Sequence, residues 1–113
     1  CALGTTKFFG VSELRVKESD RISSVANGLR KCGVSVSDTK DTMEIIGKGA
    51  GSVTGGVLCE SNFDHRIAMS FLCLGLASVN KISVDDVSSI DTSFPTFFSL
   101  MTNLGAEMKR EVN

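Results

Sequence analysis

The sequence predicts an α+β protein in which strands and helices alternate along the chain. A pattern of strand, loop, helix and strand occurs twice, beginning at residue 5 and again at residue 57, which indicates a weak internal repeat. Apolar residues recur at helical spacing in separate segments, and short β-prone runs lie between them. With 113 residues, 42% of them hydrophobic, the chain has the size of one domain and enough apolar side chains for a core.

The first half of the chain is expected to contain a strand, a helix and a β-hairpin. Its predicted strands cover residues 5–9, 34–37 and 43–46. Residues 12–18 are polar and charged, which is typical of a loop. A helix is predicted over residues 20–32, with Ser19 as its N-cap and Gly33 as its stop, because apolar residues recur at helical spacing between them.

The second half is expected to repeat the alternation and to end with a strand. Its predicted strands cover residues 57–60, 81–85 and 106–111. Asp64 is predicted to cap a helix over residues 65–78 that is apolar on nearly every side. Ser93 followed by Pro95 is typical of the start of a further helix, and Gly105 is expected to end it.

Composition argues against nucleic-acid and membrane partners. The formal net charge is −1, and the chain has neither Trp nor Tyr. A general basic field, on which many nucleic-acid binders depend, is therefore missing, and a base-stacking platform is not expected. The longest nearly apolar stretch, residues 67–77, is too short to span a bilayer and indicates a buried helix. We expect a cytoplasmic protein and a monomer.

The four cysteines, at positions 1, 32, 59 and 73, favour reduced thiols over a disulfide framework. None of them forms a CxxC pair, and the single histidine is not spaced with them as a zinc ligand would be, so no metal site is expected. Cys32 and Cys73 fall in apolar helical patterns and are predicted to lie in the core. The stripe of Phe94, Phe97 and Phe98 is also predicted to be core.

Two short charged segments, residues 15–21 and 64–66, stand where loops enter the two predicted apolar helices. They place Arg21 and Arg66 in the first helical turn. The positive end of the helix dipole disfavours a cation there by about 0.3–1 kcal/mol. The same helix start binds anions, because its free N–H groups point outward, and an arginine adds further donors. These segments therefore predict a site for a phosphate or a carboxylate.

Two other interpretations of the same residues stay open at this point. In the first, Arg21 and Arg66 are surface residues that serve only in ion pairs, and the domain is structural. Their candidate partners are then Asp20, Glu18 and Asp64. In the second, the chain is a small phosphate- or RNA-binding α/β module without catalysis, although its acidic balance and few aromatics argue against RNA.

Three motifs resemble one known family, the 5-enolpyruvylshikimate-3-phosphate synthases. Residues 13–21, ELRVKESDR, with a helix ending in residues 28–33, GLRKCG, resemble one hallmark of that family. Residues 64–69, DHRIAM, resemble a second hallmark. Residues 93–98, SFPTFF, followed by LGA at residues 104–106, resemble its usual C-terminal stretch. The motifs come in the family's order and cover nearly the whole chain.

The resemblance implies a fold of two lobes, each built from three copies of a βαβαββ unit. This chain would form about one and a half units, with residues 1–50 as the end of one unit and residues 51–113 as most of the final unit. It implies transfer of the enolpyruvyl group of phosphoenolpyruvate to the 5-hydroxyl of shikimate 3-phosphate, with release of phosphate and without a metal or organic cofactor. Because the other lobe is missing, the isolated chain is expected to be inactive.

The family's site residues are carried over to the matching positions of this chain. By resemblance, Lys17, Arg21 and Arg66 bind the phosphate and the carboxylate of phosphoenolpyruvate. Glu18 matches a carboxylate that passes a proton at the methylene carbon of this substrate. His65 matches a histidine placed near the same ligand. These residues form the predicted site, with Glu18 and His65 as its catalytic members.

One position departs from the family's pattern. Thr92 stands where many members carry a lysine, and because it cannot supply a cation it is left out of the predicted site. The TSFP sequence of residues 92–95 and the match over residues 64–70 resemble the bacterial subgroup that includes glyphosate-tolerant enzymes. The family's second catalytic carboxylate, an aspartate, and the main contacts to shikimate 3-phosphate would precede residue 1.

Overall fold

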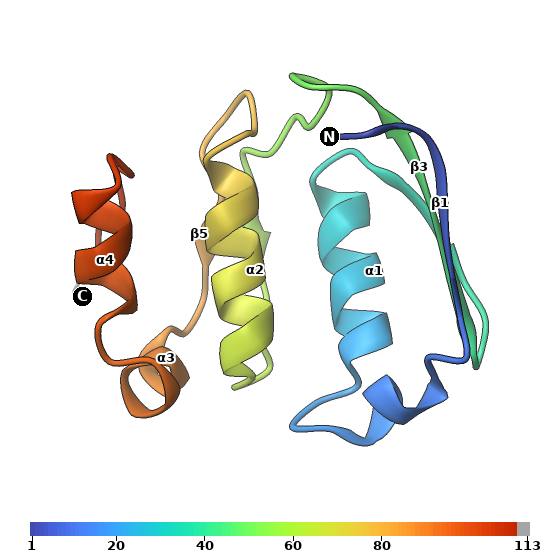
Figure 1. Cartoon of the computed structure of the whole chain (residues 1–113), viewed down its shortest axis with the longest axis horizontal. Helices are drawn as coiled ribbons and strands as arrows, with labels where there is room; N and C mark the ends of the chain where they lie inside the picture. The colour runs from blue at the N-terminus through green and yellow to red at the C-terminus, as the bar shows by residue number, and fades with distance from the viewer. Residues whose placement is uncertain (111–113) are drawn as a thin grey trace.

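The computed structural model describes residues 1–110, and it begins with a three-stranded antiparallel sheet covered by a helix. The strands follow the order β1-β3-β2 in this sheet. Helix α1 packs against one face of the sheet, and a short 3-10 helix, η1, leads into it (Figure 1). The bounds of these elements are β1 (Leu3–Phe9), η1 (Ser12–Val16), α1 (Arg21–Lys31), β2 (Ser35–Asp38) and β3 (Thr42–Lys48).

The second half contains a parallel pair of short strands joined through helix α2, and two further helices. The two strands pair Leu58 with Ser83 and Cys59 with Val84. The bounds of these elements are β4 (Leu58–Cys59), α2 (His65–Gly75), β5 (Ser83–Val84), α3 (Ser88–Ser93) and α4 (Phe97–Asn103). In residues 1–110, no helix combines the length and the apolar character needed to cross a bilayer.

Helices α1 and α2 lie side by side in Figure 1 and meet closely at Gly28. A Cβ atom at Gly28 would lie 2.1 Å from Cζ of Phe71, so only glycine allows the ring to approach the helix backbone. Phe71 belongs to a buried cluster, and each such fully buried apolar side chain stabilises the fold by about 1.5–3 kcal/mol. The members of the cluster are Cys32, Val53, Cys59, Ile67, Phe71 and Ile82.

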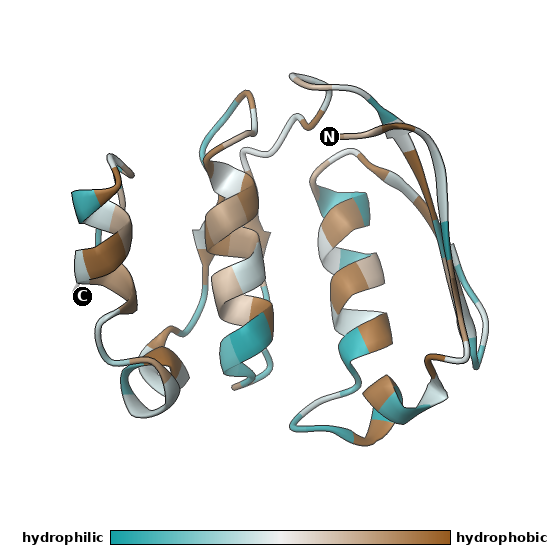
Figure 2. Ribbon diagram, viewed as in Figure 1, coloured by the Kyte–Doolittle hydropathy of each residue, from teal (hydrophilic) through white to brown (hydrophobic). Residues whose placement is uncertain are grey.

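Most predicted elements near these helices are confirmed. The hairpin forms between β2 and β3, and Gly33, with φ of 89°, follows α1 as its stop. Asp64 caps α2 by accepting a hydrogen bond from the N–H of Arg66 at 3.0 Å. Figure 2 shows hydrophilic residues at the start of α2 and hydrophobic residues along its later turns, as expected for a helix that enters a core.

Two predictions about the segment before α1 are wrong. The predicted loop over residues 12–18 contains the 3-10 helix η1. Ser19 is not the N-cap of α1, because that position belongs to Asp20, whose carboxylate accepts a hydrogen bond from the N–H of Ser23 at 3.0 Å. The hydroxyl of Ser19 instead donates to Asp64 at 2.7 Å. A longer-range partner therefore displaces the local capping bond.

The predicted structure after residue 85 is also wrong in two places. Ser93 is the last residue of α3 and does not cap α4, which begins four residues later at Phe97. Helix α3 contains one buried apolar residue, Ile90, so it produces no periodic signal. Residues 106–110 form no strand, since the N–H of Ala106 bonds to the carbonyl of Met101 at the end of α4. The remaining residue of that predicted strand, 111, lies outside the described residues.

The predicted core is correct in part. Cys32 is buried, but Cys73 is exposed, because it lies on the solvent side of α2. Phe97 is buried, whereas Phe94 is 40% exposed. Among the described residues all four cysteines are free thiols, and burial raises the pKa of Cys59 to about 12. A thiol with such a pKa is protonated at neutral pH and unreactive.

Candidate functional site

The starts of α1 and α2 lie together, as predicted from the sequence. The two helices run side by side and begin at the same end of the molecule (Figure 1). Nε of Arg21, the first residue of α1, donates to Oδ2 of Asp64, the N-cap of α2, at 2.9 Å. One ion pair therefore joins two helix N-termini, and their partial positive charges point into the same region.

Asp64 is the most buried polar residue of this region, with none of its side chain exposed to solvent. Its carboxylate also accepts hydrogen bonds from the hydroxyl of Ser19 at 2.7 Å and from the N–H of Arg66 at 3.0 Å. Burial opposes ionisation of Asp64, but these bonds, first among them that from Arg21, outweigh it and hold the pKa of Asp64 below its ordinary value. Asp64 is thus an ionised, fully partnered carboxylate.

The guanidinium of Arg21 makes contacts along one edge, and its other edge has no hydrogen-bond partner within the described residues. Its side chain is 11% exposed and pairs with Asp64 and with Glu18. The hydrogen bond to Asp64 raises the pKa of Arg21 above its ordinary value. These contacts engage Nε and Nη2, whereas Nη1 has no hydrogen-bond partner within residues 1–110. Since a guanidinium carries five N–H donors, two of them remain available for an anion.

The other two predicted cations, Lys17 and Arg66, are exposed. Neither side chain makes an ion pair in the part of the chain that the structure describes. Arg66 is the second residue of α2, directly after His65, which is half-buried. The structural interpretation of the cations as ion-pair partners therefore fits Arg21 in part and does not account for Arg66 or Lys17.

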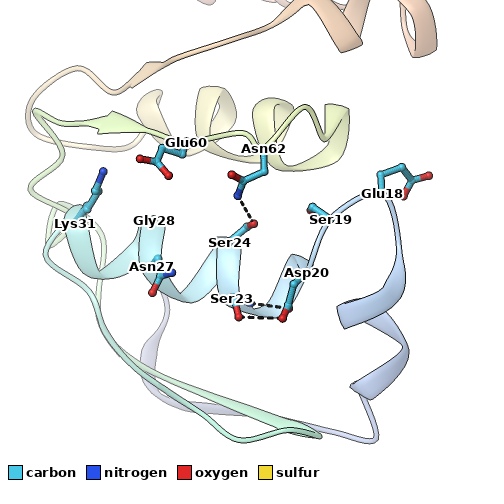
Figure 3. A pocket seen from close by; sticks show the side chains of 10 residues that line it. All are labelled: Glu18, Ser19, Asp20, Ser23, Ser24, Asn27, Gly28, Lys31, Glu60 and Asn62. Atoms are coloured by element: carbon cyan, nitrogen blue, oxygen red, sulfur yellow. Dashed lines mark hydrogen bonds between the residues drawn. The ribbon is translucent and has the colours of Figure 1, made fainter.

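Glu18 lies just outside the start of α1 and is 53% exposed. It stands at one end of an open polar groove of about 460 Å³ that runs along α1 toward Lys31 (Figure 3). Within the described residues, Glu18 is the one predicted site residue that lines this groove. The groove and the cluster of cations therefore meet at Glu18 but do not coincide.

The segment that leads into α2 has a strained backbone. Asn62 and Phe63 have φ of 52° and 57°, a left-handed conformation that residues other than glycine seldom adopt. Such residues cost about 1–3 kcal/mol each and persist where the surrounding structure fixes them. Here the amide of Asn62 donates to the hydroxyl of Ser24 on α1 at 2.8 Å, as drawn in Figure 3. This contact fixes the chain just before Asp64.

Sequence reasoning missed the central position of Asp64 and the contribution of Ser19. The sequence predicts Asp64 as a helix cap and as one of three candidate ion-pair partners of the arginines, whereas it predicts Ser19 as a cap and not as a donor to Asp64. The hydrogen bond between them joins residues 45 positions apart, and no local pattern encodes such a pairing. The charge pattern of the two helix starts did place both residues beside the arginines, which was the one available signal.

Together, the fold and the two joined helix starts define an α+β lobe that places Arg21 and Arg66 in the first turns of two neighbouring helices. A family model described as EPSP synthase (3-phosphoshikimate 1-carboxyvinyltransferase) matches residues 1–101. Since the match covers most of its residues, the chain belongs to the EPSP synthase family. The resemblance inferred from the three sequence motifs is therefore confirmed.

Relatives and solved structures agree with this assignment. The chain is 56% identical over 110 residues to the 3-phosphoshikimate 1-carboxyvinyltransferase of Dinoroseobacter shibae, covering 97% of this chain and 24% of that protein. The relative from Paracoccus denitrificans is 58% identical over 107 residues, which cover 95% of this chain and 24% of the relative. An EPSP synthase structure from Acinetobacter baumannii superposes with a TM-score of 0.86 at 44% identity, covering 91% of this chain and 24% of that one.

The structural match confirms the predicted fold class, an α+β lobe of the enolpyruvate transferase type. The chain spans about a quarter of the length of the relatives it matches.

Proposed function

We propose that this chain is part of an enzyme that transfers the enolpyruvyl group of phosphoenolpyruvate to the 5-hydroxyl of shikimate 3-phosphate and releases phosphate. The names of the relatives and the family match support this reaction. The observation that carries the proposal is the junction of the two helix starts, where Arg21 is fixed by Asp64 while its Nη1 edge stays open. This arrangement is suited to a substrate that carries two anionic groups.

In this proposal Lys17, Arg21 and Arg66 bind the anionic groups of phosphoenolpyruvate. Arg21 is pre-organised by its ion pairs, so little side-chain entropy is lost when it binds an anion. Arg66 and Lys17 are exposed cations that order around the ligand. The free N–H groups at the two helix starts add donors without adding charge.

Glu18 and His65 are the proposed catalytic residues. In the addition step the 5-hydroxyl loses its proton as its oxygen bonds to the enol carbon of phosphoenolpyruvate, and the methylene carbon gains a proton. In the elimination step the carbon–oxygen bond to phosphate breaks, phosphate leaves, and a proton is removed from the new methyl group. Glu18 is the proposed residue that passes this proton, and its contact with Arg21, a proposed ligand of the anionic groups, supports this role. His65, at the first position of α2, flanks the same ligand.

The chain supplies only part of the catalytic machinery. We assign residues 1–50 to the end of one βαβαββ unit and residues 51–113 to most of the next, a division supported by the end of the first sheet at Lys48 and the start of the second at Leu58. A second catalytic carboxylate and the main shikimate 3-phosphate contacts belong to the rest of the enzyme. We further propose a cytoplasmic, monomeric enzyme.

The test is a chimaera in which this chain replaces the matching 110 residues of the Dinoroseobacter shibae relative. Phosphate release is assayed with phosphoenolpyruvate and shikimate 3-phosphate, and the isolated chain serves as the control. We expect turnover in the ordinary range for enzymes, about 1–10³ s⁻¹, from the chimaera and none from the isolated chain. A folded chimaera without turnover would overturn the proposal.

A further inference from the structure

Asp64 is the residue through which the two helix starts contact each other. Its Oδ2 accepts from Nε of Arg21 at 2.9 Å and from the hydroxyl of Ser19 at 2.7 Å, both on the α1 side. Its Oδ1 accepts from the N–H of Arg66 at 3.0 Å, on the α2 side, and Nη2 of Arg21 lies 3.4 Å away. One carboxylate therefore fixes an arginine side chain of one helix and the backbone of the next.

A helix cap alone does not account for this environment. Capping requires one acceptor oxygen, and asparagine serves nearly as well as aspartate in that role. A fully buried ionised carboxylate is costly unless cationic and hydrogen-bonding partners surround it. Asp64 has these partners, and the strongest of them is the guanidinium of Arg21. The negative charge of Asp64 is therefore explained by its ion pair with Arg21, because capping alone requires no charge.

The contact also sets the direction of the guanidinium. Because the group is planar and rigid, bonds at Nε and Nη2 fix the orientation of the Nη1 edge. Glu18 contacts the same Nη2 atom from outside, so Asp64 and Glu18 together leave Nη1 as the open edge of Arg21 within the described residues. Without Asp64, the side chain of Arg21 would lose its buried anchor.

We propose that Asp64 is a positioning residue for phosphoenolpyruvate: it touches no substrate, but it orients Arg21 and fixes the start of α2 that carries Arg66. This assignment rests on the proposed function. It predicts that the charge of Asp64 contributes to substrate binding, and that this contribution passes through Arg21.

Asp20 provides a matched control. It caps α1 as Asp64 caps α2, accepting from the N–H of Ser23 at 3.0 Å. It also pairs with an arginine, since Nη1 of Arg15 lies 3.0 Å from its Oδ2. Arg15 also donates to the hydroxyl of Ser23 on α1, and its remaining contacts go to Asp38 and to the carbonyls of Thr39 and Lys40 at the turn between β2 and β3, with none to Asp64. Both aspartates are thus caps paired to arginine, but only one reaches the site.

The experiment compares Asp64→Asn with Asp20→Asn in the chimaera described above. Asparagine keeps an oxygen for the cap but removes the charge that holds the arginine. For Asp64→Asn we expect the KM for phosphoenolpyruvate to rise about tenfold with a much smaller change in kcat, as for a lost ground-state contact. For Asp20→Asn we expect a lower unfolding temperature with an unchanged KM for phosphoenolpyruvate.

Two further variants separate positioning from loss of structure. In an Arg21→Ala background, Asp64→Asn should add nothing further to the KM for phosphoenolpyruvate, because residues that act through one another are not additive. Ser19→Ala, which removes one donor to Asp64 and no charge, should raise the same KM by a smaller factor. Ser19→Ala keeps the assignment testable if Asp64→Asn does not fold.

The outcomes are distinct. An unchanged KM in both Asp64→Asn and Ser19→Ala would overturn the assignment and leave Asp64 as a cap. A full effect of Asp64→Asn in the Arg21→Ala background would overturn it as well, because Asp64 would then act without Arg21. Turnover by the unsubstituted chimaera tests the proposed function separately, since the assignment of Asp64 is taken from ratios between active variants.

Discussion

Arg21 and Arg66 occupy the first turns of two neighbouring helices, and their surroundings differ. Arg21 is 11% exposed and is held between Asp64 and Glu18. Arg66 is exposed and makes no ion pair within the described residues, while its backbone N–H is bonded to the same Asp64. Both are cations at the positive end of a helix, which by itself is unfavourable. One buried carboxylate offsets that cost at both helix starts.

The difference between Arg21 and Arg66 indicates that the two side chains contribute to the proposed site in different ways. In the proposed site, Arg21 is fixed by its ion pairs before the ligand binds, so its contribution to binding has little entropic cost. Arg66 has the freedom to close on a ligand. A third arginine, Arg15, lies in the same charged segment as Arg21, and it contacts Asp20, Asp38, the hydroxyl of Ser23 and two backbone carbonyls. The two arginines of residues 15–21 therefore differ, since Arg15 makes contacts within the fold and Arg21 belongs to the proposed site.

The largest expected effect separates proton transfer from anion binding. In the chimaera, Glu18→Gln should lower kcat about 10²–10⁴-fold with a far smaller change in the KM for phosphoenolpyruvate, because glutamine keeps the size of the side chain but passes no proton. Steady-state kinetics measure both values, and Glu44→Gln, on β3, is the control. A near-normal kcat with weakened substrate binding would show that Glu18 positions the substrate instead.

The second prediction compares the contributions of Arg21 and Arg66 to the free energy of unfolding. Arg21→Ala leaves the buried charge of Asp64 without its main partner, which typically destabilises a protein by about 3–5 kcal/mol. Arg66→Ala removes an exposed side chain and should change the free energy of unfolding by no more than about 0.5 kcal/mol. Urea unfolding of the chain measures both values. Equal losses in the two variants would contradict the difference described above.

A third, smaller effect tests whether close helix packing brings the two starts together. Gly28→Ala places a methyl group 2.1 Å from Cζ of Phe71, and such overpacking typically costs about 1–3 kcal/mol. Asn27→Ala, on the exposed side of the same turn, should be nearly neutral. Thermal unfolding distinguishes the two variants. A Gly28→Ala chain as stable as the unsubstituted one would mean that the helices separate without cost.

The smallest expected effect is a dependence of stability on pH. The pKa of Asp64 is held below its ordinary value in the fold, so its stabilising contribution is present above the unfolded value of about 3.9 and is lost as the pH falls through the folded value. Asp20 and Asp38 behave in the same direction. Urea unfolding at pH 7 and pH 3 should show lower stability at pH 3. Asp64→Asn should reduce this difference, and an unchanged difference would argue that Asp64 does not titrate as described.

The sequence predicted those parts of the fold that depend on local signals. Helical periodicity located α1 and α2, and the cap at Asp64 and the stop at Gly33 were correct because each depends on residues a few positions away. Helix α3 was missed because burial of Ile90 is its one apolar contribution, and this depends on packing against α2. Ser93 was assigned as a cap because a serine before a proline suits a helix start, although here it ends α3.

The nearness of the two predicted helix starts is confirmed, but the contacts between them could not be predicted from the sequence. The charges of residues 17–21 and 64–66 indicated two anion-binding helix starts, and the structure brings these starts together. Asp64 was one of three candidate partners of Arg21, but the sequence could not select it, since its contacts with Arg21 and Ser19 span more than 40 positions of chain. Such pairings depend on how α1 packs against α2, which local patterns do not encode.

The starts of α1 and α2 are proposed to bind one anionic substrate, and the KM for phosphoenolpyruvate in the chimaera, measured after Arg21→Ala and after Arg66→Ala, tests this proposal. Each variant removes charge-assisted hydrogen bonds worth about 1.5–3 kcal/mol, so each should raise this KM by about one to two orders of magnitude. Arg15→Ala, measured beside them, should leave it unchanged. If either Arg21→Ala or Arg66→Ala keeps the KM of the unsubstituted chimaera, the two helix starts do not share one substrate.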